Sequence, residues 1–266
     1  MRSIAVRRAA LAASAATFAL LVTACGGSSD DGDKAGDGKG AQAGATATAT
    51  ASAAPAKALT SADLEKAALT QQDVKSGTVV TKVPAKDDIA QDKVTADDAA
   101  CTPLALLQTG SYVGKPAATA KRAWSDTPKK PAAGASDADA MLAAVDVAKV
   151  QLTLASYENG GAEQVMKDLT AAAGKCAGGF TYTAAGEKTK ILKVTTTQAP
   201  EGADEALAVT LLVDAEDDVK MPVKAVAARK GATLVLIPAV NFASAATGED
   251  FSFPTQILQA QLAKLG

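Results

Sequence analysis

Residues 207–213 read Leu-Ala-Val-Thr-Leu-Leu-Val, and residues 223–240 read Val-Lys-Ala-Val-Ala-Ala-Arg-Lys-Gly-Ala-Thr-Leu-Val-Leu-Ile-Pro-Ala-Val; these two stretches decide the fold. In the first, apolar residues at 207, 209, 211 and 213 alternate with their neighbours, which predicts a half-buried strand. The second is interrupted by Gly231, which predicts a hairpin with arms at 223–229 and 232–240. Pro238 predicts an edge or a bend, because proline has no backbone N–H to donate.

Outside this hairpin, the apolar spacing alternates between that of strands and that of helices. Residues 145–154 predict a strand, and the Pro, Ala, Gly, Ser and Asp residues between 129 and 140 are interpreted as a surface loop before it. The clearest amphipathic helix follows the turn at 159–161. Its apolar residues are Ala162, Val165, Met166, Leu169, Ala172, Ala173 and Cys176. A last helix is expected to begin at Pro254.

Capping patterns predict short helices in the first part of the folded region. Thr60 and Asp63 form a capping box just before an apolar run, and Thr70 with Asp73 repeats the pattern. Pro103 suits the first turn of a further helix. The order of elements is helices, a strand, a helix, several strands and a helix. It favours a single α+β domain with a central, mostly antiparallel twisted sheet flanked by helices.

The N-terminus has the features of a lipoprotein signal peptide. Three arginines and no acid precede an apolar run from Ala9 to Ala24, which ends at Val22-Thr23-Ala24-Cys25. The run is short for a membrane span, which needs roughly 20 residues. We therefore expect residues 1–24 to be removed and Cys25 to be lipidated, which anchors the protein to the outer face of the cell membrane. The alternative is an ordinary cleavage site followed by a chance cysteine.

A spacer separates the expected anchor from the folded region. Residues 25–58 are mostly Gly, Ser, Asp, Ala and Thr and predict a disordered tether, because they cannot bury enough apolar surface to fold. The sensor or binding domain is expected at 59–266. Loss of the three arginines lowers the formal net charge from −2 to −5, and no basic patch is present, so no nucleic-acid partner is expected.

The remaining cysteines and the absence of histidine limit the kinds of site that the chain can form. Cys101 and Cys176 form an even pair in an oxidising compartment, so we expect a disulfide; two free thiols are the alternative. The chain has no histidine, which excludes histidine-based catalytic triads and histidine metal ligands. The acids between Asp214 and Asp218 are interpreted as a solvated turn rather than a catalytic pair. We expect no enzyme activity, no cofactor and no metal.

Four residues are candidates for a ligand cleft. Arg122 and Trp124 would face the same way on a strand, as a stacking or anion-binding pair does, although a lone tryptophan is more often a core residue. Asn241 and Phe242, with the phenylalanines at 251 and 253, are candidates to line a cleft. These phenylalanines equally suit the core of a chain with few aromatic residues.

Four segments are considered together: Ala118 to Trp124, Gly161 through Phe180, Asp204 to Leu207, and Arg229 through Asn241. Together they resemble the PknH-like extracellular sensor domain of actinobacterial kinases and lipoproteins. The resemblance covers most of the chain from about Leu59. It implies a central antiparallel sheet flanked by helices, with a large cleft for a ligand. The kinase members carry two disulfides and this chain has cysteines for one, a departure that bears on the shape of the cleft.

These observations lead to two main hypotheses. The first is a membrane-anchored extracellular lipoprotein that acts as a non-enzymatic ligand-binding or sensor module for a small molecule, a cell-wall fragment or a protein partner. The second is a lipid or glycolipid carrier, for which the Ala, Val and Leu content would supply an apolar cavity; an acidic or polar cleft would argue against it. A hydrolase that uses carboxylates or a Ser-Lys pair has no supporting motif.

Overall fold

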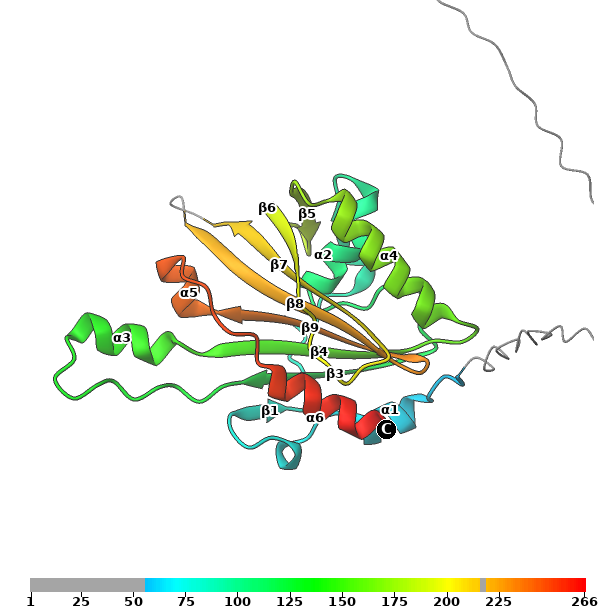
Figure 1. Ribbon diagram of the computed structural model, residues 1–266, viewed down its shortest axis with the longest axis horizontal. Coiled ribbons are helices and arrows are strands. Elements are labelled where there is room, and N and C mark those ends of the chain that lie inside the picture. The colour runs from blue at the N-terminus through cyan, green and yellow to red at the C-terminus, as the bar shows by residue number, and fades with distance from the viewer. Residues whose placement is uncertain (1–55, 216–218) are drawn as a thin grey trace, which may run out of the picture. The chain divides into compact units, whose positions relative to one another are not determined.

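The strands of the chain form one nine-stranded sheet in the computed structural model (Figure 1). The structure describes residues 56–215 and 219–266. The predicted signal peptide, the lipidation of Cys25 and most of the tether lie outside the described residues, as do residues 216–218 of the acidic turn. None of the described helices is both long enough and apolar enough to cross a membrane.

The sheet has the strand order β1-β3-β4-β9-β8-β7-β6-β5-β2, and every neighbouring pair is antiparallel. The strands are β1 (Thr78–Val80), β2 (Val94–Ala96), β3 (Ala118–Ser125), β4 (Ala148–Ser156), β5 (Phe180–Ala184), β6 (Glu187–Thr197), β7 (Glu205–Asp214), β8 (Lys220–Lys230) and β9 (Thr233–Asn241). The predicted α+β class with an antiparallel sheet is confirmed.

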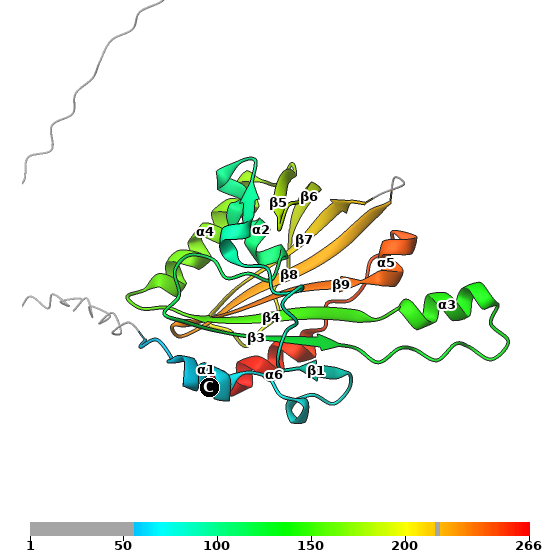
Figure 2. The ribbon, with the colours of Figure 1, turned by 180° about the vertical axis from the view of Figure 1, so that it is seen from behind.

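Helices cover both faces of the sheet (Figures 1 and 2). The α-helices are α1 (Ser61–Ala67), α2 (Thr102–Gln108), α3 (Asp137–Val145), α4 (Gly161–Lys175), α5 (Phe242–Thr247) and α6 (Thr255–Leu265); short 3-10 turns are η1 (Gln71–Asp73), η2 (Gln91–Lys93) and η3 (Ala99–Cys101). Two core clusters result. One lies between the sheet and helices α2 and α4, and the other lies between the sheet and helices α1 and α6.

The alternation of side chains explains why both faces are filled. In β9, Leu234 and Leu236 belong to the first cluster, whereas Val235 and Ile237 belong to the second. A central strand covered on both faces has a continuous apolar run, which is the pattern at 234–237. At about 25 cal/mol per Å² of buried apolar surface, such side chains supply most of the driving force for folding.

The predicted helix starts are confirmed at Thr60, Pro103 and Pro254, whereas Thr70 precedes only the three-residue 3-10 turn η1. The Thr60 hydroxyl accepts a hydrogen bond from the Asp63 amide at 3.2 Å and donates to the Asp63 carboxylate at 2.7 Å, so it caps α1. Pro103 lies in the first turn of α2, and Pro254 immediately precedes the first residue of α6. Helix α4 buries its predicted apolar face, from Ala162 to Ala173.

One local prediction is wrong, and one of the two alternatives for Pro238 is excluded. The end of the expected loop forms the start of α3, so Val145 ends a helix and the strand begins only at Ala148; Ser136 caps α3 through the Asp139 amide. Pro238 does not lie at an edge, because β9 is paired on both sides. In the pairing of β9 with β4, Pro238 has no partner residue. It therefore occupies a gap in the hydrogen-bond ladder, as expected for a residue with no N–H.

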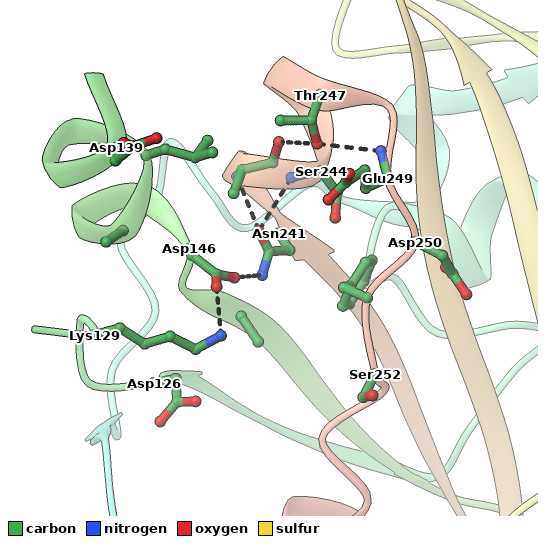
Figure 3. A pocket seen from close by; sticks show the side chains of 15 residues that line it. Asp126, Lys129, Asp139, Asp146, Asn241, Ser244, Thr247, Glu249, Asp250 and Ser252 are labelled. Atoms are coloured by element: carbon green, nitrogen blue, oxygen red, sulfur yellow. Dashed lines mark hydrogen bonds and ion pairs between the residues drawn. The ribbon is translucent and has the colours of Figure 1, made fainter. Parts of the chain in front are cut away.

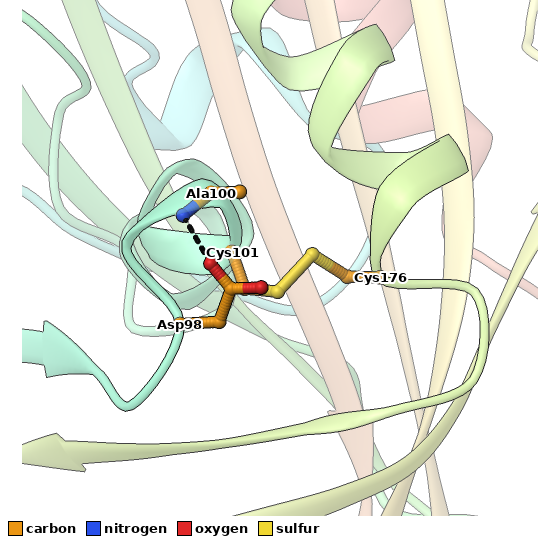
Figure 4. The surroundings of a disulfide bond; sticks show 4 residues. All are labelled: Asp98, Ala100, Cys101 and Cys176. Carbon is orange, nitrogen blue, oxygen red and sulfur yellow. Dashed lines mark hydrogen bonds between the residues drawn. A yellow bond between two sulfur atoms is a disulfide. The ribbon is translucent and has the colours of Figure 1, made fainter. Parts of the chain in front are cut away.

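The predicted disulfide is confirmed. Cys101, at the end of η3, is bonded to Cys176, which caps the C-terminus of α4 (Figure 4). Both cysteines are buried in the first cluster. The bond joins the two helices on this face across 75 residues of chain, which restricts the unfolded state.

Candidate binding cleft

Asn241 is the residue around which the candidate cleft is built. It ends β9 and caps α5, and its side-chain oxygen accepts hydrogen bonds from the amides of Ala243 (2.9 Å) and Ser244 (3.3 Å). Its side-chain nitrogen donates to Asp146, just after α3, at 2.9 Å. Asn241 is buried, and these hydrogen bonds join α5 to the residue that follows α3.

Asp146 connects Asn241 to Lys129, and these three residues are called the hub below. The second carboxylate oxygen of Asp146 accepts from Lys129, which lies on the segment that leads from β3 to α3 (Figure 3). The hydrogen bonds from Lys129 first, and from Asn241 second, lower the pKa of Asp146. The carboxylate is therefore ionised and held by two donors from separate parts of the chain.

A cleft of about 600 Å³ opens beside this hub, between α3, α5 and the segment that follows α5 (Figure 3). Its lining is Asp126, Lys129, Asp139, Leu142, Ala143, Asp146, Ala148, Asn241, Ala243, Ser244, Thr247, Glu249, Asp250, Phe251 and Ser252. Five of these residues are acidic and one is basic. Asp146 pairs with Lys129, and Asp250 pairs with Lys224 at 2.9 Å. Within the described ranges, Asp126, Asp139 and Glu249 make no ion pair, so the cleft is electronegative.

Phe242 lies near this hub but is not part of the cleft lining. It begins α5 and is 48% exposed, and the Lys149 ammonium lies 4.7 Å from the centre of its ring. Of the other two phenylalanines, Phe251 lines the cleft and Phe253 packs against the second core cluster.

Arg122 lies elsewhere and is fully used in holding the chain together. It is 5% exposed on β3, and its guanidinium donates to the backbone carbonyls of Leu69 (3.1 Å) and Thr81 (3.1 Å). It also donates to the Glu65 carboxylate at 2.7 Å. Arg122 therefore fixes α1 and the segments after it against β3, and its five N–H donors all have partners within the protein.

Trp124 faces the same way as Arg122, as the sequence predicts, and occupies the second core cluster. It is 1% exposed, and its indole N–H donates to the Ser76 carbonyl at 3.0 Å. The structure thus brings Asn241 to a cleft with Phe242 close in sequence, and places Arg122 and Trp124 together at a buried structural position.

Other hollows are lined differently. One of about 610 Å³ lies beside Tyr182, whose hydroxyl donates to Gln108; burial raises the pKa of this phenol. A smaller one, of about 310 Å³, lies beside Pro238 and Val240 and has mostly apolar walls. Among the described residues, no group of three or more His, Cys, Asp or Glu side chains is placed to hold a metal ion.

Sequence reasoning missed all five acids of the cleft. They come from three segments that are far apart in the chain, at 126, 139–146 and 249–250. None stands in a recognisable motif. The signal that could have located them is the cap pattern at Ser136 and Asp139, which would have revealed α3 inside the expected loop.

Comparisons with known proteins give a likeness to solved structures alone. No protein-family model matches the chain, and no curated protein matches it. Among solved structures, the chain is similar to the extracellular domain of PknH from Mycobacterium tuberculosis. That match covers 79% of this chain and 95% of the other, at 12% sequence identity and a TM-score of 0.43. Membership of the PknH-like family therefore stays a prediction from the sequence.

Proposed function

We propose that this protein is a membrane-anchored extracellular lipoprotein that binds a ligand in the cleft between α3 and α5 and does not catalyse a reaction. The single observation that carries the proposal is this electronegative cleft of about 600 Å³, a volume within the usual range of ligand sites. The signal peptide predicted at residues 1–24, just before Cys25, together with the buried disulfide, supports a secreted location.

The chemistry of the cleft favours binding over catalysis. A general acid needs a raised pKa, whereas Lys129 and Asn241 lower that of Asp146. The chain also has no histidine to serve as an acid or base. The acidic lining disfavours the alternative of a lipid or glycolipid carrier, because apolar acyl chains do not compensate the desolvation of carboxylates.

Native mass spectrometry of the protein secreted from a bacterial host tests this proposal. Ala143 lines the cleft from α3, whereas its neighbour Ala144 is exposed and does not line it. Ala143→Trp therefore fills the cleft, and Ala144→Trp makes the same substitution on another side of the helix. We expect the native protein and Ala144→Trp to carry an additional mass that denaturation releases, and Ala143→Trp to lack it.

Two results would count against the proposal. One is that neither the native protein nor Ala144→Trp carries a ligand. The other is that Ala143→Trp retains the same ligand at the same occupancy, which would locate binding away from the cleft.

A further inference from the structure

Helix α3 carries apolar side chains that it does not bury. None of its residues is buried. Its large apolar side chains are exposed to 72% at Met141, 37% at Leu142 and 38% at Val145. The view in Figure 1 shows α3 at the end of a long extension from the sheet. An isolated helix of nine residues is marginal in water, because most helical stability comes from packing of an apolar face. The structure thus leaves an apolar face of α3 without a packing partner among the described residues.

This face borders the acidic cleft. Successive residues of a helix are rotated by roughly 100°, so Asp139, Leu142, Ala143 and Asp146 share the side that lines the cleft. Met141 and Val145 lie next to Leu142 on the side that turns away from the cleft, and Asp137 lies one turn before Met141 on that same side. Leu142 belongs to both surfaces, so the apolar face and the electronegative cleft form one continuous region.

The charges of this region select the kind of partner. Asp126, Asp139 and Glu249 make no ion pair within the described ranges, and the lysines at 129 and 224 are held by Asp146 and Asp250. A partner that covers the region must therefore supply cations toward the cleft and apolar side chains toward α3.

We propose that the partner is a protein segment that carries both Lys or Arg and large aliphatic side chains, and that docks with its cations in the cleft and its apolar residues on α3. This inference rests on the proposed function and names the class of ligand. A second copy of the chain would face acids with acids across a symmetric interface. An anionic membrane surface would repel the acids beside the apolar face.

Fluorescence anisotropy with synthetic peptides tests the inference on the secreted protein. The probe is a labelled 12-residue peptide of Lys and Leu at helical spacing. One control peptide has Glu in place of Lys, and the other has Ser in place of Leu. We expect the Lys-Leu peptide to bind at least tenfold more tightly than either control, and its affinity to fall as salt is added.

Variants locate the docking surface. Asp126→Asn with Glu249→Gln removes two charges without removing a hydrogen bond of the fold, and Met141→Ser removes an exposed apolar side chain. We expect each variant to weaken the Lys-Leu peptide about three- to tenfold, as loss of exposed ion pairs or of one partly buried side chain does. The matched controls are Glu158→Gln, beyond the opposite end of β4, and Val80→Ser, exposed on β1; neither should change the affinity.

Several outcomes would overturn the inference. They are equal binding of all three peptides, binding of none, and equal effects of the cleft variants and their controls. Self-association in sedimentation that Met141→Ser abolishes would assign α3 to a second copy. Binding to phosphatidylglycerol vesicles that depends on Met141 would assign it to a membrane. A ligand other than a peptide in the native mass spectrum, lost in Ala143→Trp, would overturn this inference and leave the proposed function standing.

Discussion

Replacing Arg122 with methionine is predicted to destabilise the fold far more than removing its ionic partner. The variant keeps an apolar stem of similar length but removes the N–H groups that donate hydrogen bonds to Leu69, Thr81 and Glu65. Leu69 is fully buried, so its carbonyl would lose its partner without access to water, which costs about 1–3 kcal/mol. With the lost charge-assisted bond, the total is about 3 kcal/mol.

The Glu65 side chain is 58% exposed, which limits its share of this energy. Water solvates the carboxylate when the pair is broken, so Glu65→Gln should lower the free energy of unfolding by no more than about 1 kcal/mol. Lys121→Met is a matched control on the same strand, because among the described residues Lys121 pairs only with a half-exposed carboxylate, that of Asp88. It should behave like Glu65→Gln.

Urea unfolding monitored by the fluorescence of the single tryptophan measures these effects. With a slope of about 2 kcal/mol per M, Arg122→Met should lower the midpoint by about 1.5 M and Glu65→Gln by less than about 0.5 M. Folded Arg122→Met should bind ligand like the native protein. Equal midpoints for the arginine and glutamate variants would refute the reasoning, as would loss of binding with unchanged stability.

Three other predictions follow from the described contacts. Replacing Cys101 and Cys176 with alanine removes a 75-residue closure and should lower the free energy of unfolding by about 4.5 kcal/mol, measured in urea; a loss under 1 kcal/mol would show that the closure does not restrict the unfolded state. Gly179→Ala should destabilise by about 3 kcal/mol or more, because this residue has a φ of +95° and an added Cβ would lie 2.3 Å from a β6 carbonyl oxygen; Gly178→Ala, with nothing nearby, is the control for the same unfolding assay. The hydrogen bond from Lys264 lowers the pKa of Asp73, so this carboxylate contributes stability above its unfolded pKa of about 3.9 that is lost as pH falls through the folded value. Lys264→Met should therefore flatten the loss of thermal stability between about pH 5 and pH 2, and an unchanged pH profile would contradict this assignment.

The sheet and its helices could be predicted because their signals are local. Alternation at 207–213 and helical spacing at 162–173 each reflect burial of one face, and both elements form where expected. The disulfide was predictable from cysteine count and compartment alone. The edge position considered for Pro238 was wrong, because this proline is tolerated through a gap in the pairing with β4, which sequence does not show.

The candidate site was harder to predict because it depends on tertiary contacts. Arg122 and Trp124 looked like a ligand pair from residue type, but their partners at Glu65, Leu69 and Ser76 are about 50 residues away in the chain. Asn241 was selected with them, yet it alone of the three lines the cleft. The cleft acids meet only because α3 returns toward α5, and α3 itself was hidden in a segment rich in Pro, Gly and Ala.

Hydrogen exchange is the most direct test of the central claim that this protein binds an extracellular ligand between α3 and α5. The protein as secreted is compared with the same protein after ligand extraction and refolding. We predict that the amides of residues 137–145 and 242–247 exchange more slowly in the protein as secreted. Identical exchange in both samples, or protection confined to α1 and β3 around Arg122 and Trp124, would contradict the account.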